Sequence, residues 1–593
     1  MTQSIDKTLK TARRHAANGD IARAAQMYRQ VLARFPANRR AMDGLKSLGA
    51  APRAAPAQTG APPQKEIAKL AQLYRQGSLA ELVEQAGLLA RIYPDAAILY
   101  DMLATANIGL GRKEQAVENY TRLVALKPDD AQVHSNLGAA LRSRGDLDGA
   151  IASFSSAIRL NPDLPEAHYN LGLAFKDRGD FPQAIDSYRV ALRLKPDFPA
   201  AHSNLCEVYE KQNRLTELEA ALQRAVSDCG SEHSEIVFRI AQLEIRKKEF
   251  AAARAHLETI RLDAIRPSLR SGYFNLLGMA CDKTQDYDKA FNAFERQNEL
   301  ERENIKPNTV DADRYLAAIR ARKQAWVSGP GPDWSGNDGG AVQSSPVFLV
   351  GFPRSGTTLL DTILRSHPDI SVFEELPMVA RVEEAFGREQ TVEDLNALSQ
   401  AEIRDLRDIY FRELDLNGDH PAPDRVIIDK LPLNISNIGL IHRIFPDSRF
   451  ILALRHPCDC VLSCFMQVFG LNDAMANFLD LGRSAELYAS TMELWQVYRD
   501  KLDLPVHVSK YEDLIKDFDG SCRALLAFLG LDWHENLENY RETAARRGVI
   551  NTPSYSQVIQ PIYKEASGRW THYRAHMEPV LPVLRPWIDA FGY

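Results

Sequence analysis

The feature that most constrains the fold of this chain is a repeat in its first half, with a period of 34 residues. The same segment recurs at that offset as Asn136-Leu137-Gly138, Asn170-Leu171-Gly172 and Asn204-Leu205-Cys206, and so do Pro94, Pro128, Pro162 and Pro196. An Ala and then an aromatic residue follow at fixed distances, at Ala116 and Tyr120, Ala150 and Phe154, and Ala184 and Tyr188. Small residues let two helix backbones approach, and Pro ends a helix that it cannot continue. Each unit therefore predicts two packed helices.

This period and these markers are the pattern of the tetratricopeptide repeat, so we expect the first half to be an all-α solenoid of helix pairs. Weaker copies extend the array, with the second-helix spacing kept by Ala24, Tyr28 and Pro36, and the whole skeleton kept by Gly278, Ala290 and Phe294. About eight units fit before residue 305.

The array is interrupted once and is followed by a different kind of sequence. A Pro- and Ala-rich stretch, APRAAPAQTGAPPQ, runs from residue 51 and breaks the repeat pattern. After residue 328 a Gly-, Pro- and Ser-rich segment ends the helical period. We therefore expect a helical piece over residues 1–48, a linker over 49–64, the repeat solenoid over 65–305, a connecting helix and linker over 306–345, and a second domain over 346–593.

A solenoid of helix pairs presents an extended concave face, and we expect this one to bind a peptide or protein rather than to serve only as packing. His134, His168 and His202 occupy one repeat position, 34 residues apart. That spacing marks a repeat position before it marks a metal site, so we interpret these residues as structural or groove-lining.

Composition excludes several classes of partner. The 72 Lys and Arg residues against 78 Asp and Glu leave a formal net charge of −6 over 593 residues, so we expect no nucleic-acid partner. The seven cysteines are too few, and odd in number, for a disulfide framework. No stretch has the apolar core of a signal peptide or of a membrane span. We expect a cytoplasmic protein without a membrane partner.

The second half opens with a strand, a glycine loop and a helix. Val347–Val350 is a short apolar run suited to a buried parallel strand, and GFPRSGTT follows it from Gly351 to Thr358. This order of elements binds phosphate through backbone amides at a helix N-terminus. The loop has the spacing of a Walker A motif but carries Thr357 where that motif has Lys, which argues against a nucleoside triphosphate. Arg354 supplies a cation inside the loop instead.

Three further apolar runs, at residues 426–428, 450–454 and 506–508, predict parallel strands. A polar residue lies close behind each run: Lys430, Arg455 and Tyr511, respectively. Open α/β sheets bind ligands at the carboxyl ends of their strands, so these residues and Arg354 are expected to converge on a nucleotide with more than one anionic group. The alternative is that Lys430 and Arg455 form ion pairs that cap the sheet.

Two segments, VFLVGFPRSGTTLLDTILRSHPDI and RFILALRHPCDCVLSCFM, resemble the sulfotransferases that use 3′-phosphoadenylyl sulfate (PAPS). The similarity is greatest to the tyrosylprotein sulfotransferase branch and extends from about Pro346 to Trp570. It implies an α/β P-loop-like domain with a parallel sheet. It also implies that PAPS is the co-substrate.

The resemblance assigns roles to individual residues. The 5′-phosphosulfate loop corresponds to Arg354, Ser355, Gly356, Thr357 and Thr358, and the 3′-phosphate ligands correspond to Arg455 and Ser463. Of the pair Glu374-Glu375, Glu375 matches the catalytic base, with Glu374 as the alternative and a solvent-facing helix cap as the non-catalytic interpretation. Lys430 matches the lysine on the leaving side, and Tyr511 matches the adenine-side tyrosine. Ser554 is placed at the transition state, and Arg569 matches a basic residue of the cofactor site.

Two departures from the family are visible in the sequence. The tyrosylprotein branch has an Arg twelve residues after its 3′-phosphate Arg, where this chain has Gln467. The animal enzymes also carry a membrane anchor, which places a secreted acceptor in doubt. Cys458, Cys460 and Cys464 have no fourth ligand at a usual metal spacing, so we interpret them as buried small residues and expect no metal.

The sequence therefore predicts a sulfotransferase in which Arg354, Lys430 and Ser554 position the reacting group and Glu375 removes the acceptor proton. The acceptor is expected to be a protein tyrosine recruited by the repeats. A carbohydrate or small-molecule acceptor, and a non-catalytic scaffold with a nucleotide-sensing domain, stay open as alternatives. So does a homodimer, because nothing in the sequence fixes the oligomeric state.

Overall fold

A computed structural model describes residues 2–17, 20–34, 38, 40–42, 44, 61–306, 309–334, 345–417, 425–546 and 567–593. The chain divides into two compact units, Met1–Ile236 and Val237–Tyr593. Residues 49–60 of the predicted linker, which spans residues 49–64, lie outside the described residues. Among the described residues, no helix has both the length and the apolar composition that crossing a membrane requires.

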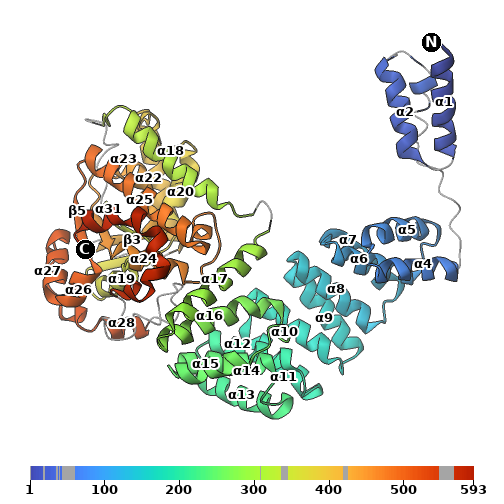
Figure 1. Ribbon diagram of the computed structural model, residues 1–593, viewed down its shortest axis with the longest axis horizontal. Coiled ribbons are helices and arrows are strands. Elements are labelled where there is room, and N and C mark those ends of the chain that lie inside the picture. Colours follow the sequence, from blue (N-terminus) through green and yellow to red (C-terminus); the bar gives the residue numbers. More distant parts are fainter. Residues whose placement is uncertain are drawn as a thin grey trace. The chain divides into compact units, whose positions relative to one another are not determined.

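Helix pairs follow one another through the first half, as the period predicts (Figure 1). The described residues form eight pairs: α1 (Thr2–Ala17) and α2 (Ile21–Arg34), α4 (Gln64–Arg75) and α5 (Leu79–Ile92), α6 (Ala97–Gly109) and α7 (Lys113–Leu126), α8 (Ala131–Arg144) and α9 (Leu147–Leu160), α10 (Pro165–Arg178) and α11 (Phe181–Leu194), α12 (Pro199–Lys211) and α13 (Leu215–Cys229), α14 (Ser234–Arg246) and α15 (Phe250–Thr259), and α16 (Pro267–Lys283) and α17 (Tyr287–Asn304).

The small residue of each repeat accommodates the aromatic ring of the second helix. A Cβ atom added to Gly138 would lie 2.8 Å from the ring of Phe154, and one added to Gly172 would lie 2.6 Å from the ring of Tyr188. Phe154 and Tyr188 are fully buried. The glycine therefore serves the close packing of the ring against the first helix, which explains why the two residue types recur together.

Capping residues end the helices where the sequence places them. Asp130 accepts hydrogen bonds from the main-chain N–H groups of Gln132 and Val133 at the start of α8. Gly145 ends that helix in the left-handed conformation, with a φ of 92°. The second helices stop one or two residues before the recurring Pro, as α9 does before Pro162.

The repeated histidines each form a hydrogen bond within their own repeat. The Nε2 atoms of His134, His168 and His202 lie 2.8, 2.9 and 3.0 Å from the carbonyl oxygens of Pro128, Pro162 and Pro196, respectively. Each ring thus ties the first helix of a repeat to the loop that precedes it, which is a structural role.

The second unit contains a five-stranded parallel sheet in the order β2-β3-β1-β4-β5. Its strands are β1 (Val347–Gly351), β2 (Ile370–Glu374), β3 (Val426–Lys430), β4 (Phe450–Leu454) and β5 (Val506–Lys510). Four of them were expected from apolar runs. The fifth, β2, is an edge strand whose short polar-ended sequence gave no such signal, and it gains its register by pairing with β3.

Both faces of the sheet are buried, as is usual for parallel strands. Val347 and Leu349 belong to one apolar core, and Phe348 and Val350 belong to the other. Helices α14 to α17 of the repeats contribute to one of these cores. The later helices that contribute to the two cores are α18 (Ala312–Ser328), α19 (Thr357–Arg365), α20 (Met378–Phe386), α21 (Val392–Asn396), α22 (Gln400–Asn417), α23 (Ile438–Ile444), α24 (Pro457–Phe465), α25 (Leu481–Lys501), α26 (Tyr511–Lys516), α27 (Phe518–Leu529), α28 (Tyr540–Arg546), α30 (Arg574–Met577) and α31 (Leu581–Phe591). Short 3-10 helices are η1 (Pro432–Asn437), η2 (Met475–Leu479), η3 (Glu535–Leu537), η5 (Arg569–Tyr573) and η6 (Glu578–Val580).

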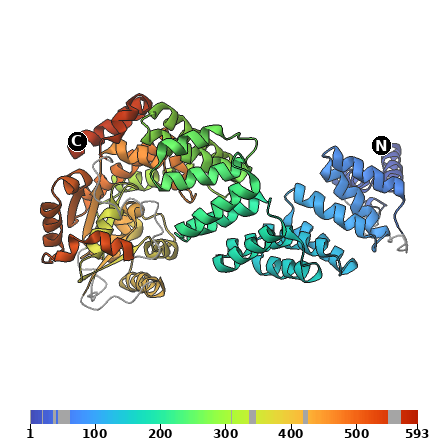
Figure 2. The same ribbon diagram turned by 90° about the horizontal axis from the view of Figure 1, so that it is seen from below.

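The last repeats share the second unit with the sheet. The division between the units falls at residue 236, so α15, α16 and α17 group with the α/β part and not with the earlier repeats. Figure 2 shows the green helices of this region beside the red C-terminal helices, and Nε2 of His576, on α30, lies at hydrogen-bond distance, 2.9 Å, from Oδ1 of Asp288 of α17. The final repeat is therefore packed as a part of the α/β unit.

Candidate active site

The loop between β1 and α19 has the shape of an anion cradle. Arg354 and Gly356 both adopt positive φ angles, 69° and 101°, which turns the chain sharply between the strand and the helix. Thr357 and Thr358 form the first turn of α19, where main-chain N–H groups are free of intrahelical partners. The hydroxyl oxygen of Ser355 is buried without a hydrogen-bond partner among the described residues. An orphaned buried hydroxyl in such a loop fits an anionic ligand.

Two arginines and a serine join this loop to the next strand and helix. The Nε of Arg354 donates to Oγ of Ser463 at 3.0 Å. Nη1 of Arg455 donates to the main-chain oxygen of Arg354 at 3.2 Å. Arg455 directly follows β4, and Ser463 lies on α24, so the loop, the end of β4 and α24 form one hydrogen-bonded group. The three predicted phosphate ligands are thus brought together.

Tyr511 completes this side of the site. The guanidinium carbon of Arg455 lies 5.3 Å from the centre of the Tyr511 ring, a cation–π distance. A Cβ atom added to Gly356 would lie 3.1 Å from Cδ2 of the same ring. The ring therefore lies against the loop and beside Arg455, at the start of the helix that follows β5.

A buried lysine holds two carboxylates at the other side of the sheet edge. The Nζ of Lys430 lies 2.9 Å from Oε1 of Glu374 and 3.0 Å from Oε1 of Glu375. The Lys430 side chain is fully buried, whereas 40% of the Glu375 side chain is exposed. Only Glu375 of the two carboxylates is thus open to an incoming acceptor.

The backbone fixes Glu375 as firmly as its side chain does. Glu374 ends β2 and pairs in register with Lys430 of β3. The N–H of Glu375 donates to the main-chain oxygen of Lys430 at 2.8 Å, and Glu375 has a φ of 53°. A non-glycine residue in this conformation carries strain, which is frequent at functional sites. Glu374 is the last residue of β2 and Glu375 follows it, whereas the N-cap of the next helix, α20, is Pro377, so the helix-cap interpretation was wrong.

Asp429, next to Lys430, was missed by the sequence analysis. Its side chain is fully buried, and Tyr410 donates a hydrogen bond to Oδ2 at 3.0 Å. Burial raises the pKa of Asp429 to about 7, and the bond from Tyr410 opposes that rise. Alternation along β3 turns this side chain away from the Lys430 side chain, so it contributes to the core beneath the site.

The remaining predicted residues have other surroundings. Arg569 forms an ion pair with Asp282 of α16, with Nη2 and Oδ1 2.9 Å apart. Its assignment to the cofactor stays a prediction. Ser554 lies outside the described residues. The amide of Gln467 donates to the main-chain oxygen of Val468 at 3.1 Å.

The three cysteines after Arg455 are all buried on α24, as expected of small core residues. The Cys464 thiol donates to the main-chain oxygen of Pro353, with 3.4 Å between the sulfur and the oxygen. Burial raises the pKa of the Cys458 thiol to about 12. The Cys464 thiol thus joins α24 to the loop.

Comparison with known proteins agrees with this organisation. Residues 346–535 match a model described as "Sulfotransferase family". Residues 109–142, 138–177 and 173–213 match "TPR repeat", and residues 9–45 and 271–304 match "Tetratricopeptide repeat".

Relatives match parts of the chain. An uncharacterized protein of Aquifex aeolicus (strain VF5) is 28% identical over 350 residues, which are 56% of this chain and 43% of that protein. Protein-tyrosine sulfotransferase 2 of Gallus gallus is 27% identical over 272 residues, 42% of this chain and 69% of the relative. The chain thus spans less than half the length of the first of these relatives. The crystal structure of PilW, a type IV pilus biogenesis factor, covers 33% of this chain and 92% of its own, at 18% identity and a TM-score of 0.30.

Proposed function

We propose that this chain, which carries tetratricopeptide repeats followed by a sulfotransferase domain, moves the sulfuryl group of PAPS to the hydroxyl of a protein tyrosine. The observation that carries the proposal is the buried Lys430, held between Glu374 and Glu375 at the sheet edge that also carries Arg354 and Arg455. That edge supplies cations for a donor with two anionic ends, and one exposed carboxylate for the acceptor.

The loop and α24 are suited to the donor. The amides of residues 355–358 and the guanidinium of Arg354 would hold the 5′-phosphosulfate. Arg455 and Ser463 would hold the 3′-phosphate, and the Tyr511 ring would lie against the adenine side. The orphaned Ser355 hydroxyl supports this assignment because an anionic oxygen would provide its missing partner.

The reaction is an in-line displacement that the chain's own residues position. A lone pair of the acceptor oxygen forms a bond to sulfur while the bond from sulfur to the bridging phosphate oxygen breaks. Adenosine 3′,5′-bisphosphate leaves with that electron pair. The acceptor proton passes to Glu375, a general-base contribution of about 10²–10⁴-fold. Lys430 contacts Oε1 of Glu375, so we assign Oε2 to take the proton.

Lys430 is placed to stabilise the charge that develops on the leaving oxygen. Transfers of this type depend on cations at the peripheral and leaving oxygens more than on covalent steps. A fully buried ammonium has few waters to compete for it, which strengthens its interaction with that oxygen. Ser554 keeps its assignment at the transition state within this proposal.

We also propose that the repeat array recruits the acceptor protein and that the chain acts in the cytoplasm. Repeat arrays of this kind offer extended surfaces for peptides. All seven cysteines are free thiols, which suits a reducing compartment.

The test is transfer of labelled sulfate from PAPS by the purified full chain into a lysate that is then separated into protein, glycan and small molecules. We expect label in the protein fraction, released as tyrosine O-sulfate after alkaline hydrolysis. Glu375→Gln keeps the shape of the side chain and should remove about 10²-fold or more of the rate. Label confined to glycans or small molecules would refute the tyrosine acceptor, and no transfer in any fraction would refute the transferase.

A further inference from the structure

One position of the repeat carries a charged residue in several units. Four residues after the small residue, the first helices of three internal repeats carry Arg142 in α8, Lys176 in α10 and Glu210 in α12. Arg142 forms an ion pair with Asp177 at 2.8 Å, and Lys176 forms one with Glu207 at 3.2 Å, in each case with the first helix of the next repeat. The last repeat has an acid there, Asp282.

Asp282 forms the equivalent bond with the α/β part of the unit. Its Oδ1 accepts from Nη2 of Arg569 at 2.9 Å and from the hydroxyl of Tyr573 at 2.6 Å. The side chains of Asp282 and Arg569 are 7% and 30% exposed, compared with 34% and 38% for Arg142 and Asp177 and 15% and 21% for Lys176 and Glu207, so the carboxylate of Asp282 is the most shielded of these groups. The segment around Arg569 thus takes the place of a next repeat.

That segment is clamped onto the first turn of α24. The N–H groups of Gly568 and Trp570 donate to the carboxylate of Asp459 at 2.7 and 2.9 Å. The Trp570 ring stacks on His456, with 5.1 Å between centroids and 20° between planes. His456 directly follows Arg455, the predicted 3′-phosphate ligand. A displacement at Arg569 therefore reaches the end of β4 through two short contacts.

The last repeat also holds the opposite end of α24. Nδ2 of Asn298, on α17, donates to the main-chain oxygen of Phe465 at 2.8 Å, and both residues are buried. The Phe465 ring stacks on Phe291 of α17, with 5.1 Å between centroids. The position of Asn298 is occupied in internal repeats by apolar residues, Ile158 and Leu192.

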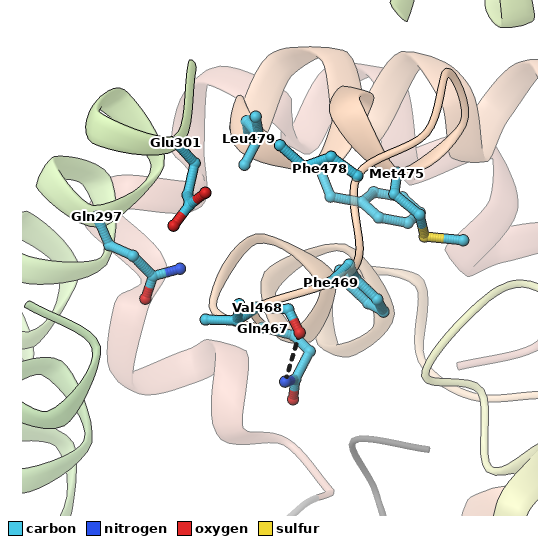
Figure 3. Close-up of a pocket in the computed structure, with 9 residues that line it drawn as sticks. Gln297, Glu301, Gln467, Val468, Phe469, Met475, Phe478 and Leu479 are labelled. Carbon is cyan, nitrogen blue, oxygen red and sulfur yellow. Dashed lines mark hydrogen bonds between the residues drawn. The ribbon is translucent and has the colours of Figure 1, made fainter. Parts of the chain in front are cut away.

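The segment that follows α24 faces the same helix. Gln297 and Glu301 of α17 line a small cavity together with Gln467, Val468 and Phe469 (Figure 3). Nε2 of Gln297 donates to Oδ1 of Asn298 at 3.2 Å, and Gln297 is fully buried. The residue that departs from the family pattern, Gln467, thus lies where this chain packs its final repeat.

We infer that the last repeat, α16 and α17, forms part of the donor site, with Asp282 as a positioning residue that acts through Arg569 and α24. This inference rests on the proposed function, since α24 carries Ser463 and follows Arg455. Asp282 and Asn298 hold the two ends of this helix, and Ser463 in turn orients Arg354 of the loop. Asp282 thereby orients the donor ligands without itself touching the donor.

The experiment measures the affinity of the full chain for adenosine 3′,5′-bisphosphate by calorimetry, and then KM for PAPS and kcat. Asp282→Asn keeps the shape and removes the charge. We expect about tenfold weaker binding, which corresponds to about 1.4 kcal/mol, and an equal rise in the KM for PAPS. The kcat should stay within about twofold of the wild type. Asp282→Glu should recover most of the affinity because it restores the charge.

Asp288→Asn is the matched control. Asp288 also joins the last repeat to the α/β part, through His576 at 2.9 Å, but its side chain is 87% exposed and does not contact α24 or the segment clamped onto it. An exposed pair of this kind contributes little, so the affinity should stay within about twofold of the wild type.

The outcomes separate the two proposals. Wild-type protein that fails to bind the bisphosphate contradicts the proposed function. Wild-type protein that binds, together with an Asp282→Asn variant of equal affinity, overturns the inference. Should that variant unfold, Tyr573→Phe removes one hydrogen bond to Asp282 and is expected to weaken binding about threefold. Unchanged affinity in Tyr573→Phe would then overturn it.

Discussion

The internal repeats and the last repeat pack their helix pairs in the same way but face different neighbours. Phe154 of α9 and Phe294 of α17 each lie against a glycine of the preceding helix, with a Cβ there 2.8 Å from either ring. The outward positions differ, with Arg142 against Asp282 and Ile158 against Asn298. The repeat pattern thus specifies the helix pair, while a few residues outside the pattern specify what the pair packs against.

The largest effects are expected when the aromatic ring that the two repeats have in common is removed. Phe154→Ala and Phe294→Ala each leave a cavity, with an expected cost of about 3–5 kcal/mol in the free energy of unfolding. Denaturant titration followed by hydrogen exchange in each unit gives the loss. Phe154→Ala should leave affinity for adenosine 3′,5′-bisphosphate unchanged, whereas Phe294→Ala should reduce it. Equal affinities in the two variants would remove the distinction between the repeats.

The next largest difference is expected in the pH dependence of stability, which should differ between the two units. Burial raises the pKa of Asp429 from 3.8 to about 7, so between these values the native state binds more protons than the unfolded state. Stability of the second unit therefore falls as pH rises through this range and is level above it. Asp429→Asn should match the wild type near pH 4 and exceed it by a few kcal/mol at pH 8.

Hydrogen exchange at the two pH values measures this in each unit separately. Because Asp429 lies in the second unit, protection of α8 to α11 should not change. A variant that is equally stable at pH 8 would show that Asp429 is ionised at no cost in the native protein.

Exchanging residues between repeats sharpens the comparison at one position. Asn298→Leu introduces into the last repeat the residue type that Leu192 has at the equivalent position. It leaves the buried carbonyl of Phe465 without its hydrogen-bond donor, so we expect a loss of about 1–3 kcal/mol in the free energy of unfolding. The reciprocal Leu192→Asn buries an amide in an internal repeat at a similar cost. Only Asn298→Leu should weaken the binding of the bisphosphate in calorimetry. Weaker binding in both variants would show that internal repeats affect the donor site as the last repeat does.

The smallest effect is expected at the surface pair of the internal repeats. Arg142→Ala removes the bond to Asp177, whose side chain is 38% exposed, so the loss should be about 0–1 kcal/mol. Thermal unfolding of the variant measures it. A loss of stability as large as that of Asn298→Leu would contradict the view that shielding from solvent makes the contacts of the last repeat stronger than those of the internal repeats.

The sequence predicts the parts of the fold that depend on local pattern. The period of 34 residues specifies the helix pairs, and the apolar runs specify β1, β3, β4 and β5. The edge strand β2 could not be predicted in this way, because its five residues, which end at Glu374, acquire strand geometry only by pairing with β3. The clustering of Arg354, Arg455 and Ser463 follows from their places at strand ends and on the next helix, so it could be expected.

The role of Asp282 could not be expected from its own segment. It is separated from Arg569 by 287 positions, and only folding brings the two together. The residue type gives no signal of this pairing, because the internal repeat helix α12 also carries an acid, Glu210, at that repeat position.

The most direct test of the account is the choice between two nucleotides by the full chain. Calorimetry with adenosine 3′,5′-bisphosphate and with ATP, without added metal, compares a ligand that carries a 3′-phosphate with one that does not. The loop lacks the Walker lysine, and Arg455 and Ser463 are assigned to a 3′-phosphate, so we predict that the bisphosphate binds at least tenfold more tightly. ATP binding as tight as that of the bisphosphate would contradict the account.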